Sequence, residues 1–447
     1  MNHRAIVRLL VVAVATSVAA GCSDHGSNLG AVAGPAGSIA PASASASPSR
    51  TATPSAAPST SAIETPTPTA EASAPPAAAK PLIVDWTRRS VAGLDGLTET
   101  RATASNGGTV VLLGHGPHDT DAGQRSMIWR STDGRHWERT LRTSTDQRIN
   151  AITAGGPGFV AVGSNGTQAA VWTSKDGVTW RPVVDSAFER GRMQSIVATK
   201  GGLVVFGGRS DTDSRVIWTS PDGIEWLAAT NESGLRVARG VEAVAAWNGQ
   251  ALAFVAPGDT LGRVEVWATT GRAEWERVAT LPGGDRFTVY RAAGGPLGWV
   301  ALGATDSATP HVAWYSEDGR HWEKAATGPD VWTSVIGVDA GFIATGSVGS
   351  LGDETCGDQR DFHGHTWTSA DGRTWQRMAV STDFEWASVS ELMVVGRNLV
   401  GIGGSYPGST EHFSDSFVPT RWTAPLPSTG LVAENSDRPS KPQGCGG

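Results

Sequence analysis

The sequence has few cysteines and tyrosines, and it lacks the charge pattern of a nucleic-acid-binding protein. Its 447 residues include three Cys and three Tyr. The formal net charge is -7, and aromatic residues are not interleaved with basic clusters, which argues against a nucleic-acid partner. There is no His-Glu-x-x-His motif and no glycine-rich phosphate loop between a strand and a helix. We therefore expect no metal, no cofactor and no nucleic acid.

The first cysteine ends an N-terminal targeting segment. Arg4 and Arg8 precede an apolar stretch, 9–20, and the segment closes with Ala19-Ala20-Gly21-Cys22. This ending resembles the lipobox of bacterial lipoproteins. The resemblance implies a signal peptide over residues 1–22, lipidation of Cys22, and export to the outer face of the cell membrane. An uncleaved membrane anchor and an ordinary cleaved signal peptide are the alternatives.

The other two cysteines are Cys356 and Cys445, and export favours a disulfide between them because exported proteins occupy an oxidising compartment. Such a bond would pin the C-terminal tail, 426–447, to a loop of the preceding domain. The alternatives are two free thiols, or a metal site with His363 and His365. The spacing of these residues fits no zinc pattern.

Residues 23–80 are rich in Ala, Ser, Pro and Thr and contain almost no large apolar side chains. A segment of this composition cannot bury enough surface to fold, so we interpret it as a disordered tether. The tether would hold the remaining domain, 81–425, away from the bilayer.

Tryptophan pairs with one fixed spacing run through that domain. Six pairs share it: Trp129/Trp137, Trp172/Trp180, Trp218/Trp226, Trp267/Trp275, Trp314/Trp322 and Trp367/Trp375. Trp422 has the context of a first tryptophan but no partner eight residues later. Trp86, near the start of the domain, has the context of the missing second member. Repetition of this kind indicates a ring of similar units that the N-terminal segment closes.

A short turn sequence, Ser-x-Asp-Gly, lies between the tryptophans in five of the pairs, as in Ser131-Thr132-Asp133-Gly134. It favours a type I turn followed by a left-handed glycine, in a three-residue hairpin loop. Such a loop would place the two tryptophans directly opposite each other on one face. The unit containing Thr269-Thr270-Gly271 lacks the Asp.

Each hairpin follows two further predicted strands. The nearer one is an apolar run, such as Val110–Gly114 in the first unit or Phe159–Gly163 in the second. The other strand lies upstream of this run, as Ile149–Thr153 does in the second unit. Four short strands per unit, in seven units, predict an all-β, seven-bladed β-propeller closed by its N-terminal strand.

The turn motif resembles a shortened Asp-box, the repeat of sialidases, xyloglucan-degrading hydrolases and seven-bladed photosystem assembly factors. The resemblance implies a fold rather than an activity, because Asp-boxes lie at the blade periphery. A sialidase-like enzyme would need an arginine triad and a tyrosine nucleophile with a glutamate, for which Tyr290, Glu242 and Arg291 are the candidates. The Phe/Tyr-Arg-Ile-Pro start of sialidases is absent, and sialidases have six blades. Another glycoside hydrolase would need two facing carboxylates.

A binding or scaffold domain in the cell envelope is the preferred interpretation. The membrane is its partner through the lipid, and a cell-wall glycan or an envelope protein is its candidate ligand. Inner strands of a propeller line the central channel, so their polar residues are the candidate site. These are Arg101, Asn150, Gln194, Glu242, Arg291, Ser334 and Ser388.

Long loops opposite the Asp-Gly turns form a second candidate surface, because variable loops on a rigid scaffold often carry specificity. The loops of the sixth and seventh units would form a rim with several acidic and histidine side chains. These are Asp353, Glu354, Asp358, Asp361, His363 and His412.

Overall fold

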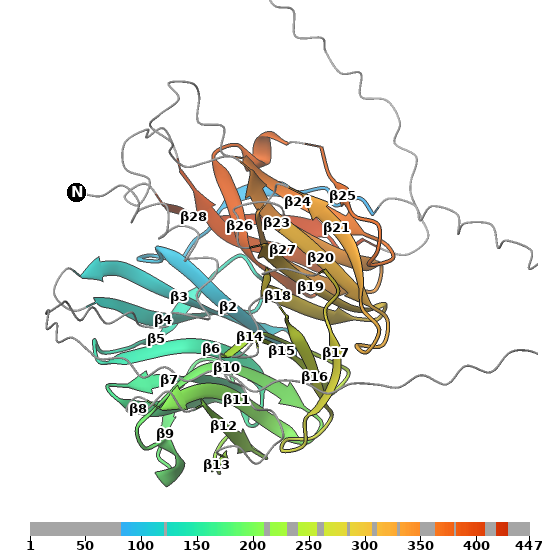
Figure 1. Ribbon diagram of the computed structural model, residues 1–447. Coiled ribbons are helices and arrows are strands. Elements are labelled where there is room, and N and C mark those ends of the chain that lie inside the picture. The colour runs from blue at the N-terminus through green and yellow to red at the C-terminus, as the bar shows by residue number, and fades with distance from the viewer. Residues whose placement is uncertain are drawn as a thin grey trace, which may run out of the picture. The chain divides into compact units, whose positions relative to one another are not determined.

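The computed structural model describes residues 82–119, 123–209, 215–229, 240–256, 263–283, 287–305, 311–328, 331–348, 363–379, 381–406 and 417–427. These residues form seven four-stranded antiparallel sheets (Figure 1). The predicted all-β, seven-bladed propeller is confirmed. The signal peptide, the tether, Cys356 and Cys445 lie outside the described residues.

Each blade runs from an inner strand outward, and in blades 1 to 6 the strands follow one another in the sequence. Blades 1 to 3 consist of β2 (Glu99–Asn106), β3 (Thr109–Asp119), β4 (Gly123–Ser131) and β5 (Glu138–Arg142); β6 (Gln147–Gly155), β7 (Gly158–Asn165), β8 (Gln168–Ser174) and β9 (Arg181–Val183); and β10 (Gly191–Thr199), β11 (Gly202–Arg209), β12 (Arg215–Ser220) and β13 (Leu227–Ala229).

Blades 4 to 6 repeat this order. They consist of β14 (Gly240–Trp247), β15 (Gln250–Ala256), β16 (Glu265–Thr269) and β17 (Glu276–Thr280); β18 (Phe287–Gly295), β19 (Gly298–Thr305), β20 (His311–Ser316) and β21 (Glu323–Gly328); and β22 (Val331–Val338), β23 (Gly341–Val348), β24 (His363–Ser369) and β25 (Gln376–Arg377).

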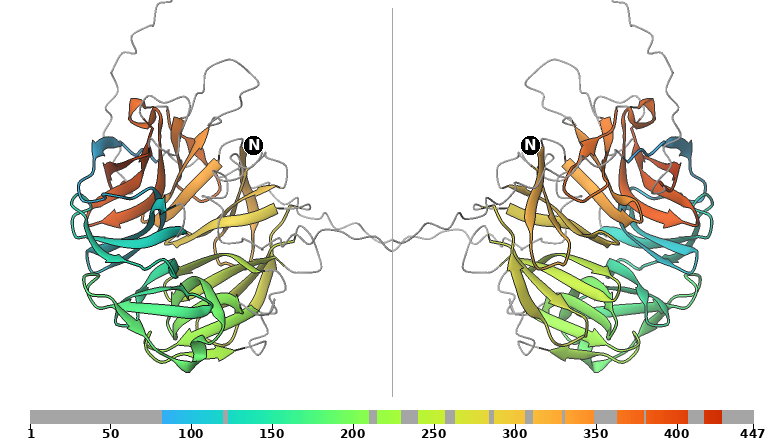
Figure 2. Two further views of the ribbon diagram at one scale, coloured as in Figure 1. Left: turned by 90° about the vertical axis from the view of Figure 1, so that its left-hand side faces the viewer. Right: turned by 90° about the vertical axis from the view of Figure 1, so that its right-hand side faces the viewer.

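Blade 7 combines both ends of the domain. It contains β26 (Ala387–Val395), β27 (Asn398–Ser405) and β28 (Val418–Pro425), and its outermost strand is β1 (Thr87–Ser90). Figure 2 shows this blue N-terminal strand lying against the orange-red strands of blade 7. Arg88 of β1 pairs with Trp422 of β28. The inner strand β26 also contacts β2 of blade 1, which closes the ring.

Helical structure is limited to two single-turn segments in the described chain, η1 (Ser186–Phe188) and η2 (Thr382–Phe384). No helix among the described residues is long and apolar enough to span a membrane.

The apolar core is divided among the seven seams between blades. Each hydrophobic cluster draws its residues from two neighbouring blades. Aromatic pairs cross these seams, as where Phe254 of blade 4 meets Trp322 of blade 5 edge-on at 5.4 Å. Burial of the repeated tryptophans therefore holds the blades to one another.

The two tryptophans of a pair are offset rather than directly opposite, so this part of the sequence prediction was wrong. Trp129 faces Arg139, two residues beyond Trp137, and Trp422 faces Arg88, two residues beyond Trp86. The offset arises because the loop between the two strands is longer than the predicted three residues. It includes the second tryptophan, and the next strand begins only after it. An offset of two residues keeps both tryptophans on one face.

Side chains of the Asp-Gly turn bind its own backbone. The Ser131 hydroxyl accepts from the Gly134 N–H at 2.9 Å, and Asp133 Oδ1 accepts from the N–H groups of Arg135 and His136 at 2.7 and 2.9 Å. Gly134 has a φ of 69°, the predicted left-handed conformation. Burial raises the pKa of Asp133, but the hydrogen bonds from His136 and Arg135 outweigh it, so the pKa lies below its usual range.

Candidate functional site

Every inner strand carries a β-bulge at the same place. The bulged residues are Arg101, Asn150, Gln194, Glu242, Tyr290, Thr333 and Ser390. The first four are predicted channel residues. Arg291 and Ser334 follow their bulges by one position, and Ser388 precedes its bulge by two. A bulge leaves backbone groups without a ladder partner, so each one must be satisfied from elsewhere.

Polar side chains of the preceding blade meet this need. The amide of Asn150 donates to the Met193 carbonyl at 2.6 Å, directly before the bulge of blade 3. The Glu242 carboxylate accepts from the Val289 N–H at 2.8 Å, directly before the bulge of blade 5. Blade 6 repeats the arrangement, since the Thr333 hydroxyl donates to the Val389 carbonyl at 2.6 Å. These bulged residues, of which Asn150 and Glu242 were predicted channel residues, therefore connect one blade to the next.

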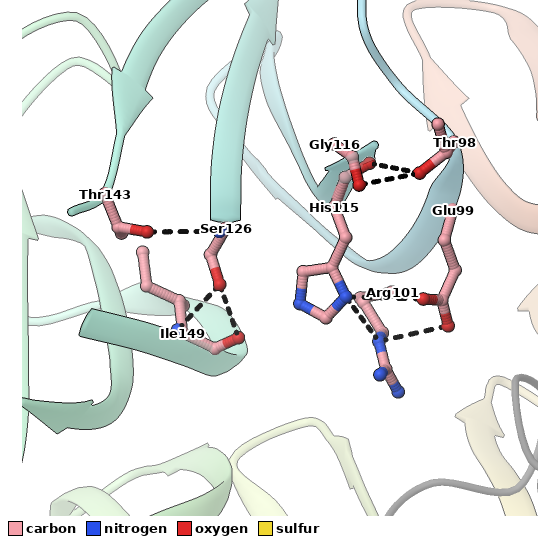
Figure 3. A network of polar contacts seen from close by, with 8 residues as sticks. All are labelled: Thr98, Glu99, Arg101, His115, Gly116, Ser126, Thr143 and Ile149. Carbon is pink, nitrogen blue, oxygen red and sulfur yellow. Dashed lines mark hydrogen bonds and ion pairs between the residues drawn. The ribbon is translucent and has the colours of Figure 1, made fainter. Parts of the chain in front are cut away.

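Blade 1 uses a different residue for the same connection. Ser126 of β4 accepts from the Ile149 N–H at 3.0 Å and donates to the Ile149 carbonyl at 3.4 Å, directly before the bulge of blade 2. Arg101, the bulged residue of blade 1, instead contacts Glu99 and His115 of its own blade (Figure 3).

Charged side chains on the inner strands of four blades lie within electrostatic range of one another. Arg101 Nε lies 3.2 Å from Glu99 Oε1, and Arg291 NH2 lies 3.8 Å from Glu391 Oε1. Arg101 also interacts electrostatically with Arg148, Arg291 and Glu391, although these residues belong to blades 2, 5 and 7. We call these five residues the axial cluster: Glu99, Arg101, Arg148, Arg291 and Glu391.

Burial governs the charges in this cluster. It lowers the pKa of Arg101, and the positive charges of Arg148 and Arg291 act in the same direction, against the raising effect of Glu99. Burial also raises the pKa of the Glu391 carboxyl, although Arg291 and Arg101 oppose the shift. Positive charge therefore exceeds negative charge in the cluster.

Hydrogen bonds fix the guanidinium of Arg291 in place. Its Nε donates to the Thr333 carbonyl at 2.8 Å, and NH1 donates to the Tyr290 carbonyl at 3.0 Å. His115, which is 1% exposed, supports Arg101, and burial lowers the pKa of its imidazole so that the neutral ring is favoured. The cluster is thus preorganised, with its polar atoms held before any ligand arrives.

In the enzyme alternative, Arg291 donates to the Tyr290 carbonyl, but the Tyr290 hydroxyl and the Glu242 carboxylate have different partners. The Tyr290 hydroxyl lies 2.9 Å from His311 Nδ1, whereas the Glu242 carboxylate binds the Val289 N–H. Burial raises the pKa of Tyr290, whereas a nucleophilic tyrosine needs a lowered one. Burial also raises the pKa of Glu242 to about 7. These contacts do not favour a tyrosine nucleophile assisted by Glu242.

The loop rim falls largely outside the described residues, which exclude Asp353, Glu354, Asp358, Asp361 and His412. His363 and His365 lie on β24, and His365 is 4% exposed. No group of three His, Cys, Asp or Glu side chains in the described part of the chain could hold a metal ion.

A pocket of about 480 Å³ lies at the periphery, between the Asp-Gly turn of blade 5 and Arg373 of blade 6. Most of its charged groups are paired within it. His321 Nδ1 is 2.7 Å from Asp318 Oδ2, and Arg373 Nε is 2.6 Å from Glu323 Oε1. The charged groups of this pocket come from two neighbouring blades, whereas those of the axial cluster come from four.

No protein-family model matches the chain, and no curated protein matches it either. Three solved structures have a similar fold. A structure of YCF48 bound to D1 peptide is 12% identical, with a TM-score of 0.48 over 78% of this chain and 97% of that one. The endosialidase of phage phi92 is 10% identical, with a TM-score of 0.45 over 81% and 72%. Virginiamycin B lyase from Staphylococcus aureus is 8% identical, with a TM-score of 0.48 over 77% and 100%. Similarities this weak transfer no function.

Sequence reasoning missed four members of this site: Glu99, His115, Arg148 and Glu391. Glu391 occupies the position after its bulge, as Arg291 does, while Glu99 and Arg148 lie two residues before theirs. The bulge shifts the strand register by one residue, which the residue pattern alone did not reveal. Charged residues within short strands of small residues were the available signal.

Proposed function

We propose that the protein is an exported, lipid-anchored binding or scaffold propeller of the cell envelope, and that the axial cluster is its ligand-binding surface. The convergence of Arg101, Arg148 and Arg291 from three blades supports this proposal most directly. Arginine forks bind carboxylates and phosphates through paired hydrogen bonds, and groups already held in place bind with less loss of conformational entropy. The ligand would therefore present an anionic group to the ring axis.

The envelope location is supported by the sequence alone, through the Ala19-Ala20-Gly21-Cys22 ending and the tether that follows it. Peptidoglycan fragments are the first ligand class to test, because their peptide carboxylates match the arginines.

Arg148 is the informative residue to change, because it is exposed and lies on the inner strand β6. Arg148→Gln should weaken the binding of muropeptides about tenfold, the effect of losing one charge-assisted hydrogen bond. Calorimetric titration of the full-length protein would measure this.

Arg181→Gln is the matched control, since Arg181 is exposed on β9, the outer strand of the same blade. Equal binding by the two variants would remove the axial cluster from the proposal. Release of new reducing ends from the muropeptides would instead support the glycoside hydrolase alternative.

A further inference from the structure

The seam between blades 7 and 1 differs in charge from the seams between blades 4 and 5 and between blades 5 and 6. In those two seams, the arginine that follows the turn glycine pairs with a glutamate that follows the second tryptophan of the preceding blade. Arg320 NH2 lies 2.8 Å from Glu276 Oε2, and Arg373 Nε lies 2.6 Å from Glu323 Oε1. At the seam between blades 7 and 1, Arg135 is the equivalent arginine. Thr87 stands where the glutamate would be.

Two further arginines, Arg421 and Arg89, lie in this seam, and Arg421 stands where most blades have an apolar residue. The position before the first tryptophan is filled in five blades by Ile128, Val171, Ile217, Val266 and Ala313. Blade 7 has Arg421 there, only 9% exposed. Arg421 pairs directly with Arg89 of the N-terminal strand, so both side chains lie on one face of the sheet. That face also carries Ile402, which packs against blade 1.

These positive charges have little compensation among the described residues. Arg421 Nε is buried and has no hydrogen-bond partner in this part of the chain. Burial, Arg135 and Arg89 all lower the pKa of Arg421, and Asp133 is the one acidic group that opposes them. The oxygens of Asp133 already accept from the N–H groups of Arg135 and His136 and contact the His136 ring. Like charges directly opposite each other on a sheet are destabilising.

We propose that Arg89, Arg135 and Arg421 form a binding site for a phosphate group, separate from the axial cluster. A guanidinium offers two parallel N–H donors, which match the oxygens of a phosphate or a carboxylate. If each of the three guanidinium groups donates through two N–H groups, the donors outnumber the roughly four lone-pair positions of one carboxylate, which all lie in one plane. Inorganic phosphate or a phosphomonoester presents oxygens in several directions and carries more negative charge than a carboxylate near neutral pH. Both properties favour phosphate.

Thermal unfolding of the full-length protein in detergent tests the site, with inorganic phosphate as the probe. Acetate and chloride at equal ionic strength control for screening, because all salts weaken repulsion between exposed charges. Phosphate should raise the melting temperature of the wild-type protein more than acetate or chloride does. Arg135→Gln changes an exposed side chain and should weaken the phosphate affinity about tenfold or more.

Two matched variants separate a specific site from a general effect of charge. Thr87→Glu supplies the carboxylate that the other two seams have, so it should stabilise the protein without phosphate and abolish the phosphate response. Arg320→Gln removes an arginine that is already paired with Glu276 and should leave the phosphate response unchanged. Dihexanoyl phosphatidic acid, whose headgroup is a phosphomonoester, compared with dihexanoyl phosphatidylcholine, distinguishes a lipid headgroup from a soluble phosphate.

A response to inorganic phosphate alone supports a site for soluble phosphate groups. An additional response to phosphatidic acid that is lost in Arg135→Gln supports a phospholipid headgroup at the same site. A phosphate response that survives both Arg135→Gln and Thr87→Glu would overturn the proposal, as would acetate acting as strongly as phosphate. None of these results depends on muropeptide binding, so this site and the axial cluster can fail independently.

Discussion

Removing the Trp86 side chain should destabilise the whole ring, because β1 supplies the outermost strand of blade 7. Trp86 is 7% exposed, and its Nε1 donates to the Thr366 hydroxyl of blade 6 at 2.9 Å. Its ring also meets Phe384 edge-on at 6.3 Å. Trp86→Ala therefore leaves a cavity and takes the hydrogen-bond donor from a buried hydroxyl. Losses of this kind cost about 3 to 5 kcal/mol, against a typical net stability of about 5 to 15 kcal/mol.

Thermal and urea unfolding of the full-length protein would measure this loss, with Trp247→Ala as the matched control. Trp247 is 40% exposed, so the same atoms are removed from a site that loses far less burial. We expect the melting temperature to fall by roughly 5 to 15 °C in Trp86→Ala and by only a few degrees in Trp247→Ala. Equal shifts in the two variants would show that the N-terminal strand does not hold the ring closed.

Three further predictions concern single residues. Hydrogen bonds keep the pKa of Asp133 below its usual value, so its contribution to stability is present above about pH 4 and is lost as the pH falls through the folded pKa. Asp133→Asn should lower the urea midpoint at about pH 7, and the difference from wild type should narrow in acid; a constant difference would contradict the hydrogen-bonding role. Burial raises the pKa of Glu242 to about 7, so its ionisation opposes folding as the pH rises from about 4.5 through that value. Glu242→Gln keeps an acceptor for the Val289 N–H and should stabilise the protein at about pH 8 but not at about pH 4, whereas a stability difference that does not change with pH would refute the argument. Cys22→Ser should block lipid attachment, and an unchanged mass together with unchanged membrane fractionation would count against the lipoprotein assignment.

The spacing of the tryptophans was enough to predict the number of blades and the closure of the ring. Large apolar side chains that recur at one spacing must occupy the same place in each repeat, because only that place buries them. For the same reason, Trp422 and Trp86 could be assigned to one pair, although they lie at opposite ends of the domain. The left-handed turn glycine was also predictable, since Ser-x-Asp-Gly has the side chains that bind such a turn.

The candidate site depended on features that only the tertiary structure shows. A bulge changes the direction of every side chain beyond it, so Arg291 and Ser334 were predicted one position away from the bulged residues. The gathering of Arg101, Arg148 and Arg291 depends on the diameter of the closed ring, because these residues lie far apart in the sequence. Arg89 and Arg421 lie opposite each other because closure of the ring pairs the N-terminal strand with β28. A sequence specifies the composition of each blade, but the proximity of charges from different blades is decided only when the ring closes.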